Sequence, residues 1–122
     1  METTSAFAIP PLHQRTRIPM RTIRAIARHI AKEFNPESII LFGSHAYGKP
    51  SNGSDVDLLV IMDTPDGEFV ASHAIVKSLP PILFRVDIIA RSRSALRKRI
   101  KMGDRFMQEI LQKGKELYAR DL

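Results

Sequence analysis

The chain has 122 residues, of which 43% are hydrophobic and 26% charged, close to the averages of folded globular proteins. Its length fits one compact domain, and its composition excludes a fibrous repeat and a chain that is disordered throughout. The absence of cysteine excludes disulfide frameworks, thiolate zinc sites and thiol nucleophiles. No apolar run approaches the roughly 20 residues of a membrane span, and no signal-peptide pattern opens the sequence, so we expect a cytoplasmic protein with no membrane partner.

Positive charge is the second global feature. Nineteen Lys and Arg against thirteen Asp and Glu give a formal net charge of +6, which favours an anionic partner such as a nucleotide, a nucleic acid or an acidic protein. The cations gather in two blocks without carboxylates, residues 15–32 and 91–101. Each block fits a solvated helix face as well as an anion-binding surface.

The amino-terminal third predicts an arm, a helix and a strand. Residues 1–19 contain three prolines and no apolar periodicity, which predicts a flexible N-terminal arm before a single domain over residues 20–122. Apolar residues then recur at helical spacing from Met20 to Phe34, with arginines on the opposite stripe, which predicts an amphipathic helix that ends before Pro36. Residues 38–42 form a short apolar run that predicts a buried strand, closed by Gly43.

The rest of the chain predicts two further strands and further helices. Residues 55–62 and 83–90 have strand character, and residues 69–79 between them predict a helix with Phe69, Val70, His73 and Val76 on one face. Beyond Ser92 the pattern favours helix to the end, in two helices over residues 94–102 and 104–113. We therefore expect an α+β fold: a mixed sheet of three or four strands with helices packed mainly on one face and acids gathered at one sheet edge.

Three carboxylates lie within the apolar strands, where an unpaired charge is costly. Asp55 and Asp57 are two residues apart on one strand, so their side chains share a face at a spacing that suits ligands of a metal pair. Magnesium prefers carboxylate and phosphate oxygens, and two such ions clamp the attacking and leaving oxygens of a phosphoryl-type displacement. Asp87 on the next strand could complete this site or deprotonate an acceptor hydroxyl.

Gly43 and Ser44 directly follow a strand, where backbone N–H groups can approach an anion without an intervening Cβ. The Ser44 hydroxyl can donate to a phosphate oxygen, and a helix that begins there would add its dipole. Each of these signals has an ordinary structural alternative. The two aspartates could cap a turn, Gly43-Ser44 could be a simple turn, and the four histidines share no metal-ligand spacing.

In combination, the stretch LFGSHAYGKPSNGSDVDLLV and the later RVDIIA resemble the signature of the minimal nucleotidyltransferases of the DNA polymerase β-like superfamily. The resemblance covers roughly residues 34–90, and the ending EILQKGKELYAR is also similar. It implies the polymerase β-like palm fold and a magnesium-dependent enzyme with two Mg²⁺ ions. Such an enzyme moves a nucleoside monophosphate, here AMP from ATP, to an acceptor hydroxyl and releases pyrophosphate. Asp55, Asp57 and Asp87 would be the catalytic metal ligands, and Gly43 and Ser44 would bind the nucleotide.

The sequence departs from the family in the loop after Gly43-Ser44, where relatives commonly carry an arginine. Tyr47 occupies this place, so Lys49 or His45 would have to supply the positive charge near the phosphates.

Many proteins of this kind resemble antitoxins that bind a ribonuclease toxin of the HEPN class and add AMP to one of its tyrosines. We therefore expect the antitoxin of such a pair, with a protein acceptor favoured over nucleic acid or a small molecule. The alternative is a non-catalytic module of the same fold that occludes a partner protein or RNA through its basic helices.

Overall fold

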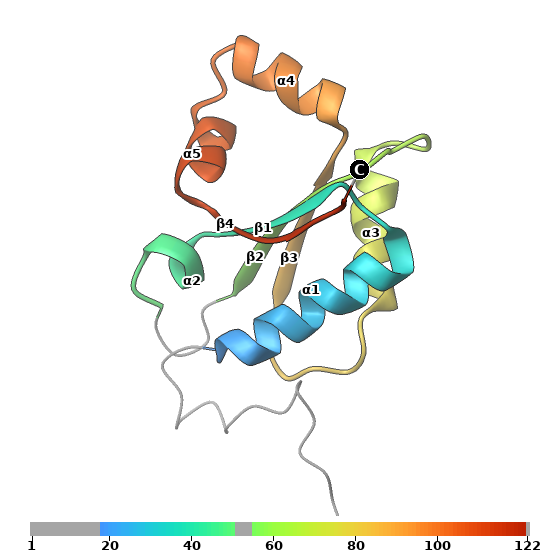
Figure 1. The fold of residues 1–122 in the computed structure, drawn as a ribbon, viewed down its shortest axis with the longest axis vertical. Helices are drawn as coiled ribbons and strands as arrows, with labels where there is room; N and C mark the ends of the chain where they lie inside the picture. Colours follow the sequence, from blue (N-terminus) through green and yellow to red (C-terminus); the bar gives the residue numbers. More distant parts are fainter. Residues whose placement is uncertain (1–17, 51–54, 122) are drawn as a thin grey trace, which may run out of the picture.

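The computed structural model describes residues 18–50 and 55–121. A four-stranded sheet in the order β3-β2-β1-β4 forms its centre (Figure 1). β1 runs antiparallel to both β2 and β4, whereas β2 and β3 are parallel. The predicted α+β class and the mixed sheet are therefore confirmed. In chain order the elements are α1 (Met20–Phe34), β1 (Ser38–Phe42), α2 (Ser44–Tyr47), β2 (Val56–Ile61), α3 (Glu68–Ser78), β3 (Val86–Arg91), α4 (Arg93–Lys101), α5 (Arg105–Lys113) and β4 (Lys115–Ala119).

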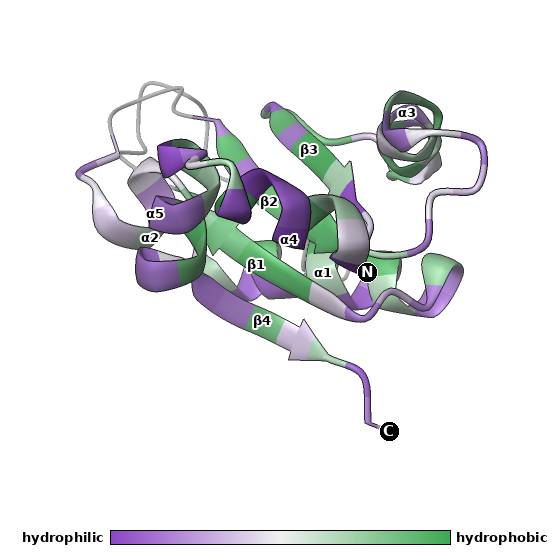
Figure 2. Ribbon diagram, turned by 90° about the horizontal axis from the view of Figure 1, so that it is seen from above, coloured by the Kyte–Doolittle hydropathy of each residue, from purple (hydrophilic) through white to green (hydrophobic). Residues whose placement is uncertain are grey.

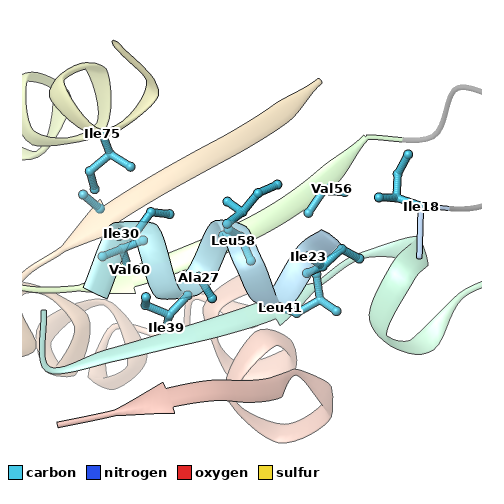
Figure 3. Packing of buried hydrophobic residues seen from close by; sticks show 12 residues of the cluster. Ile18, Ile23, Ala27, Ile30, Ile39, Leu41, Val56, Leu58, Val60 and Ile75 are labelled. Atoms are coloured by element: carbon cyan, nitrogen blue, oxygen red, sulfur yellow. The ribbon is translucent and has the colours of Figure 1, made fainter. Parts of the chain in front are cut away.

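The larger part of the core lies between α1, α3 and one face of the sheet. Ile23, Ile26 and Ile30 of α1 are fully buried, and Figure 3 shows α1 side chains against alternate residues of β1 and β2. The arginines of α1 face outward because they alternate with these isoleucines at helical spacing. Asn35, in the left-handed conformation, and Pro36 end the helix as predicted.

A smaller cluster covers the opposite face. The alternate residues of β1 and β2, among them Phe42 and Leu59, pack against Leu96 of α4 and Met107 and Ile110 of α5. Both faces of the central strands are thus apolar, as the hydropathy colouring of β1 and β2 in Figure 2 shows. Helices were expected mainly on one face of the sheet. α1 and α3 cover that face, and α4 and α5 form a second layer on the opposite face that the expectation did not include.

α3 connects the parallel strands β2 and β3 and lies beside the β3 edge (Figure 2). The Ser72 hydroxyl accepts a hydrogen bond from the Ala90 amide on this edge. The predicted face is exposed: Phe69, Val70 and Val76 are open to solvent, and Ile75 is the buried residue of the helix.

The strands are shorter than predicted at some ends, and the chain does not stay helical to its end. β2 begins after Asp55, and β3 begins three residues later than the pattern predicted. Both predicted C-terminal helices are present, and the side chains of Ser92 and Asp104 cap their amino ends. Residues after Gly114, expected to be helical, form the edge strand β4.

Of the predicted arm, residues 1–17 lie outside the described part, and the arm stays a prediction there. Ile18 is already buried in the core beside α1. Among the described residues, no helix is both long enough and apolar enough to cross a membrane.

Candidate functional site

The sheet brings the predicted acidic residues together. Asp57 is the second residue of β2 and Asp87 the second residue of β3, and the parallel register pairs them directly. Side chains in register on adjacent strands share a face, here the face of Leu59 and Ile89. Asp55, two residues before Asp57, lies just before β2 begins. All three predicted carboxylates therefore lie at one end of β2 and β3.

The pKa of Asp57 reflects how close these carboxylates are. Burial, the nearby carboxylates of Asp87 and Asp55, and a hydrogen bond with Asp87 together raise the pKa of Asp57 from 3.8 to about 6, and burial contributes most. Close negative charges of this kind are stabilised when a cation lies between them.

Gly43 places the loop after β1 against Asp57. Its φ of 76° is in the left-handed region, and a Cβ at this position would overlap the Asp57 carboxylate oxygen Oδ2. The β1–β2 register also pairs the preceding residue, Phe42, with Asp57. Gly43-Ser44 and the acidic residues, separate motifs in the sequence, are therefore one site. α2 begins at Ser44 and is a single turn of four residues.

Arg85 is the cation that the structure brings to this site, and the sequence reasoning did not select it. Its Nε lies 3.8 Å from Asp55 Oδ2, and its Nη2 lies 3.6 Å from Asp87 Oδ1. The side chain is 77% exposed, so the ion pairs are weak and can open. The sequence signal was available, since Arg85 lies two residues before Asp87.

The three carboxylates fit a divalent ion by their chemistry, because they are hard oxygen donors that repel one another in its absence. Among residues 18–50 and 55–121, no three His, Asp or Glu side chains already form a closed group of metal ligands. Asp55 and Asp87 instead turn toward Arg85. A cation at the acidic residues would thus have to compete with this guanidinium.

The two residues expected to compensate for Tyr47 differ in position. Lys49 is exposed, as is Tyr47 itself. His45 is 3% exposed, and its ring is hydrogen-bonded on both sides, to the Ile18 amide and to the Asp55 carbonyl. His45 therefore points into the protein and cannot supply charge to a phosphate group. Sequence reasoning gave it only a weak signal, its position next to Ser44.

A cavity of about 570 Å³ adjoins the acidic site on the outer side of β3. Its lining includes the apolar side chains of Phe69, Val76 and Ile82 together with Arg85 and Asp87. Phe69 and the nearby Leu83 are among the most exposed large hydrophobic residues of the described chain, at 86% and 81%. Asp87 is thus shared between the acidic cluster and an open, largely apolar cavity.

The sequence of residues 24–122 matches the family model described as "Polymerase beta, Nucleotidyltransferase". The chain belongs to the polymerase beta nucleotidyltransferase family. Among curated proteins, none matches the sequence significantly. The acidic end of β2 and β3 and the Gly43 loop both lie within the matched residues.

Two solved structures share this fold. One is a proposed nucleotidyltransferase from Sulfolobus solfataricus, with a TM-score of 0.56 and 20% sequence identity, and the match covers 80% of this chain and 78% of that one. The other is a toxin–antitoxin structure with AMP-PNP, with a TM-score of 0.53 and 22% identity over 80% of this chain and 74% of that one. At these identities the likeness establishes the fold.

Proposed function

We propose that this nucleotidyltransferase transfers AMP from ATP to a hydroxyl group of a partner protein. The observation that carries the proposal is the convergence of Asp55, Asp57 and Asp87 beside the Gly43 loop. Clustered carboxylates next to a glycine loop that packs directly against Asp57 suit a nucleotide held through divalent cations.

Each part of the site has a separate task in this proposal. Asp55, Asp57 and Asp87 would hold two Mg²⁺ ions, which when bound stabilise negative charge on the phosphates. Gly43 and Ser44 would hold the distal phosphates through the loop backbone and the Ser44 hydroxyl. Asp87 would also accept the proton of the acceptor hydroxyl. The acceptor oxygen bonds to the α-phosphorus, the bond to the bridging oxygen breaks, and pyrophosphate leaves.

The cavity beside β3 supports a protein acceptor. Its exposed apolar rim is the type of surface that binds another protein, and Asp87 lies at its border with the acidic cluster. An acceptor that docks there would present its hydroxyl to Asp87, while the triphosphate lies on the Gly43 side of the acids.

We further propose that the partner is a toxin of the HEPN class and that the acceptor is a tyrosine, as the sequence resemblance implies. A protein of this fold has been solved in a toxin–antitoxin structure with AMP-PNP, which supports both a toxin partner and an adenine nucleotide. The chain would then act as an antitoxin.

The test is incubation of the purified chain with Mg²⁺ and α-labelled ATP, alone and with a lysate from its own host. We expect a labelled protein that disappears with the double variant Asp55→Asn/Asp57→Asn. The matched control is Asp63→Asn/Asp66→Asn, which removes two charges from exposed positions after the other end of β2. Equal labelling by both double variants would contradict the proposal.

The second candidate is a non-catalytic module that binds an anionic partner. It is favoured by Arg21, Arg24 and Arg28, which are exposed along α1 and form no ion pair with any described residue. Under this function, reversal of the three charges would abolish partner binding, and Asp55→Asn/Asp57→Asn would not. Binding that survives the reversal would exclude this surface.

A further inference from the structure

His45 makes two hydrogen bonds that join three separate parts of the chain. Its Nε2 accepts a hydrogen bond from the Ile18 amide at 3.0 Å, and its Nδ1 lies 3.1 Å from the Asp55 carbonyl oxygen. Because an amide can only donate, Nε2 must be unprotonated, and the proton of the neutral ring is on Nδ1. The Nδ1–H group therefore donates to the carbonyl of Asp55.

The peptide unit that follows Asp55 is held from both sides. Its carbonyl accepts from His45, and its N–H, which belongs to Val56, donates to the Arg85 carbonyl at 3.0 Å. One bond comes from α2 and the other from the residue before β3. The plane of this peptide, and with it the Cα of Asp55, is thus fixed relative to both neighbouring elements.

This arrangement matters because Asp55 lies outside the regular ladder. Asp57 and Asp87 are positioned by paired strands, but β2 begins only at Val56. Asp55 therefore depends for its orientation on the two bonds that hold the following peptide unit, one of which comes from His45. His45 directly follows Ser44 in the chain, so its hydrogen bond to Asp55 also ties the Gly43-Ser44 loop to the acidic cluster.

We infer that His45 is a positioning residue, which orients Asp55 for a divalent cation through the Asp55 main-chain carbonyl. The inference rests on the metal-binding role proposed above for Asp55. His45 does not contact the cation or the nucleotide. Its contribution resembles that of groups that hydrogen-bond metal ligands, whose loss lowers metal affinity by about 10- to 100-fold.

Two substitutions separate the two bonds of the ring. In His45→Asn the amide nitrogen takes the place of Nδ1, so the bond to Asp55 is kept and the bond from Ile18 is lost. In His45→Gln the longer side chain brings its oxygen to the place of Nε2, so the bond from Ile18 is kept and the bond to Asp55 is lost. Each variant leaves one backbone group unpaired, the buried Ile18 amide or the partly buried Asp55 carbonyl, so we expect a loss of stability in both.

The experiment measures Mn²⁺ affinity of the full chain by the electron paramagnetic resonance signal of the free ion. We expect His45→Gln to weaken Mn²⁺ binding by about tenfold, and His45→Asn to stay close to the wild-type protein. Asp55→Asn should weaken binding at least as much as His45→Gln. Urea unfolding of both His45 variants checks that their stabilities match.

Equal affinities of His45→Gln and His45→Asn, whether both normal or both reduced, would overturn the inference, since a purely structural role affects both alike. A wild-type chain that binds no Mn²⁺, or whose binding does not depend on Asp55, would also overturn it. Mn²⁺ binding that follows the expected order without any labelled acceptor would contradict AMP transfer while it supports the role of His45.

Discussion

Gly43 and the Asp57 carboxylate occupy adjoining space, and this contact leaves no room for a side chain at Gly43. Gly43→Ala would place a methyl group against Asp57 Oδ2 in a backbone conformation that is unfavourable for alanine. We expect transfer of label to fall by at least about tenfold, because a shift of the acidic residues by a fraction of an ångström costs catalytic alignment. Labelling with α-labelled ATP is the measurement.

Gly103→Ala is the matched control for Gly43→Ala. Gly103 has a similar φ of 88°, but a Cβ there would meet nothing within 4 Å. Both variants should lose about 1 kcal/mol of unfolding free energy through backbone strain, and Gly43→Ala alone should lose activity. Equal activities would show that the contact with Asp57 is not important.

The raised pKa of Asp57 predicts a pH-dependent effect on stability. Because its pKa is higher in the folded protein than the usual value of 3.8, the folded state binds this proton more tightly. Its contribution is fully present below pH 3.8 and is lost as the pH rises through about 6. Asp57→Asn removes the charge, so we expect the variant to be more stable than wild type by ~1 kcal/mol at pH 7.5, a figure reduced for partial exposure of the carboxylate.

Urea unfolding at pH 4 and pH 7.5 measures the Asp57→Asn effect. The difference between variant and wild type should be small at pH 4 and larger at pH 7.5, and Mg²⁺ should reduce it at pH 7.5 by stabilising the wild-type fold. A difference that stays the same at both pH values would contradict the charge repulsion.

Whether the sequence could predict a site residue depends on how far apart along the chain the residue and its contacts lie. Asp57 and Asp87 follow from strand alternation, because in-register strands bring such residues together. Asp55 follows from its spacing to Asp57. The pair of Arg85 and Asp87 is local, since the two residues are two apart. The contacts of Arg85 and of His45 with Asp55 arise only in the assembled chain, the first from the residue before β3 and the second from α2, and no local pattern encodes them.

At the scale of the elements, β4 shows where pattern reading failed. The segment KELYA has one strongly apolar residue per face at most, and Lys, Glu, Leu and Ala all favour helix. It becomes a strand because β1 offers an open edge, and Gly114 lets the chain turn there. A Cβ at Gly114 would meet the carbonyl oxygens of Ile110 and Leu41. Tertiary pairing thus overrides the local helix preference.

α3 shows a different case, in which the helix was correctly predicted but its apolar stripe is not the face that packs. Phe69, Val70 and Val76 are the more hydrophobic stripe, yet the helix contacts the core through Ile75 and smaller residues. The exposed stripe borders the cavity that contains Asp87. Apolar surface left open beside a reactive group is expected where a partner binds.

Phe69→Ser tests this face of α3. Phe69 is exposed, so the change should alter the unfolding free energy by less than about 0.5 kcal/mol, while labelling of a protein acceptor should fall several-fold because the partner loses an apolar contact. The control is Met102→Ser, at a similarly exposed position after α4. Unchanged labelling by Phe69→Ser would place the acceptor on another surface.

At the scale of the whole molecule, the charges form two opposing fields. The chain carries +6 overall, which attracts a nucleotide from a distance, but the site itself presents three carboxylates. A triphosphate that reached these carboxylates alone would be repelled. Nucleotide and divalent cation should therefore stabilise the fold far more together than either does alone.

Thermal unfolding with a non-hydrolysable ATP analogue measures this cooperation. With Mg²⁺ and analogue at about 100 times the dissociation constant, the stabilisation should be about 2.7 kcal/mol, which for a domain of this size corresponds to a rise in Tm of about 10 °C. Analogue with EDTA, or Mg²⁺ alone, should give much smaller shifts, and Asp55→Asn/Asp57→Asn should remove the large one. A full shift without Mg²⁺ would mean that Arg85 and the basic helices bind the phosphates directly, and the carboxylates would then have no metal to hold.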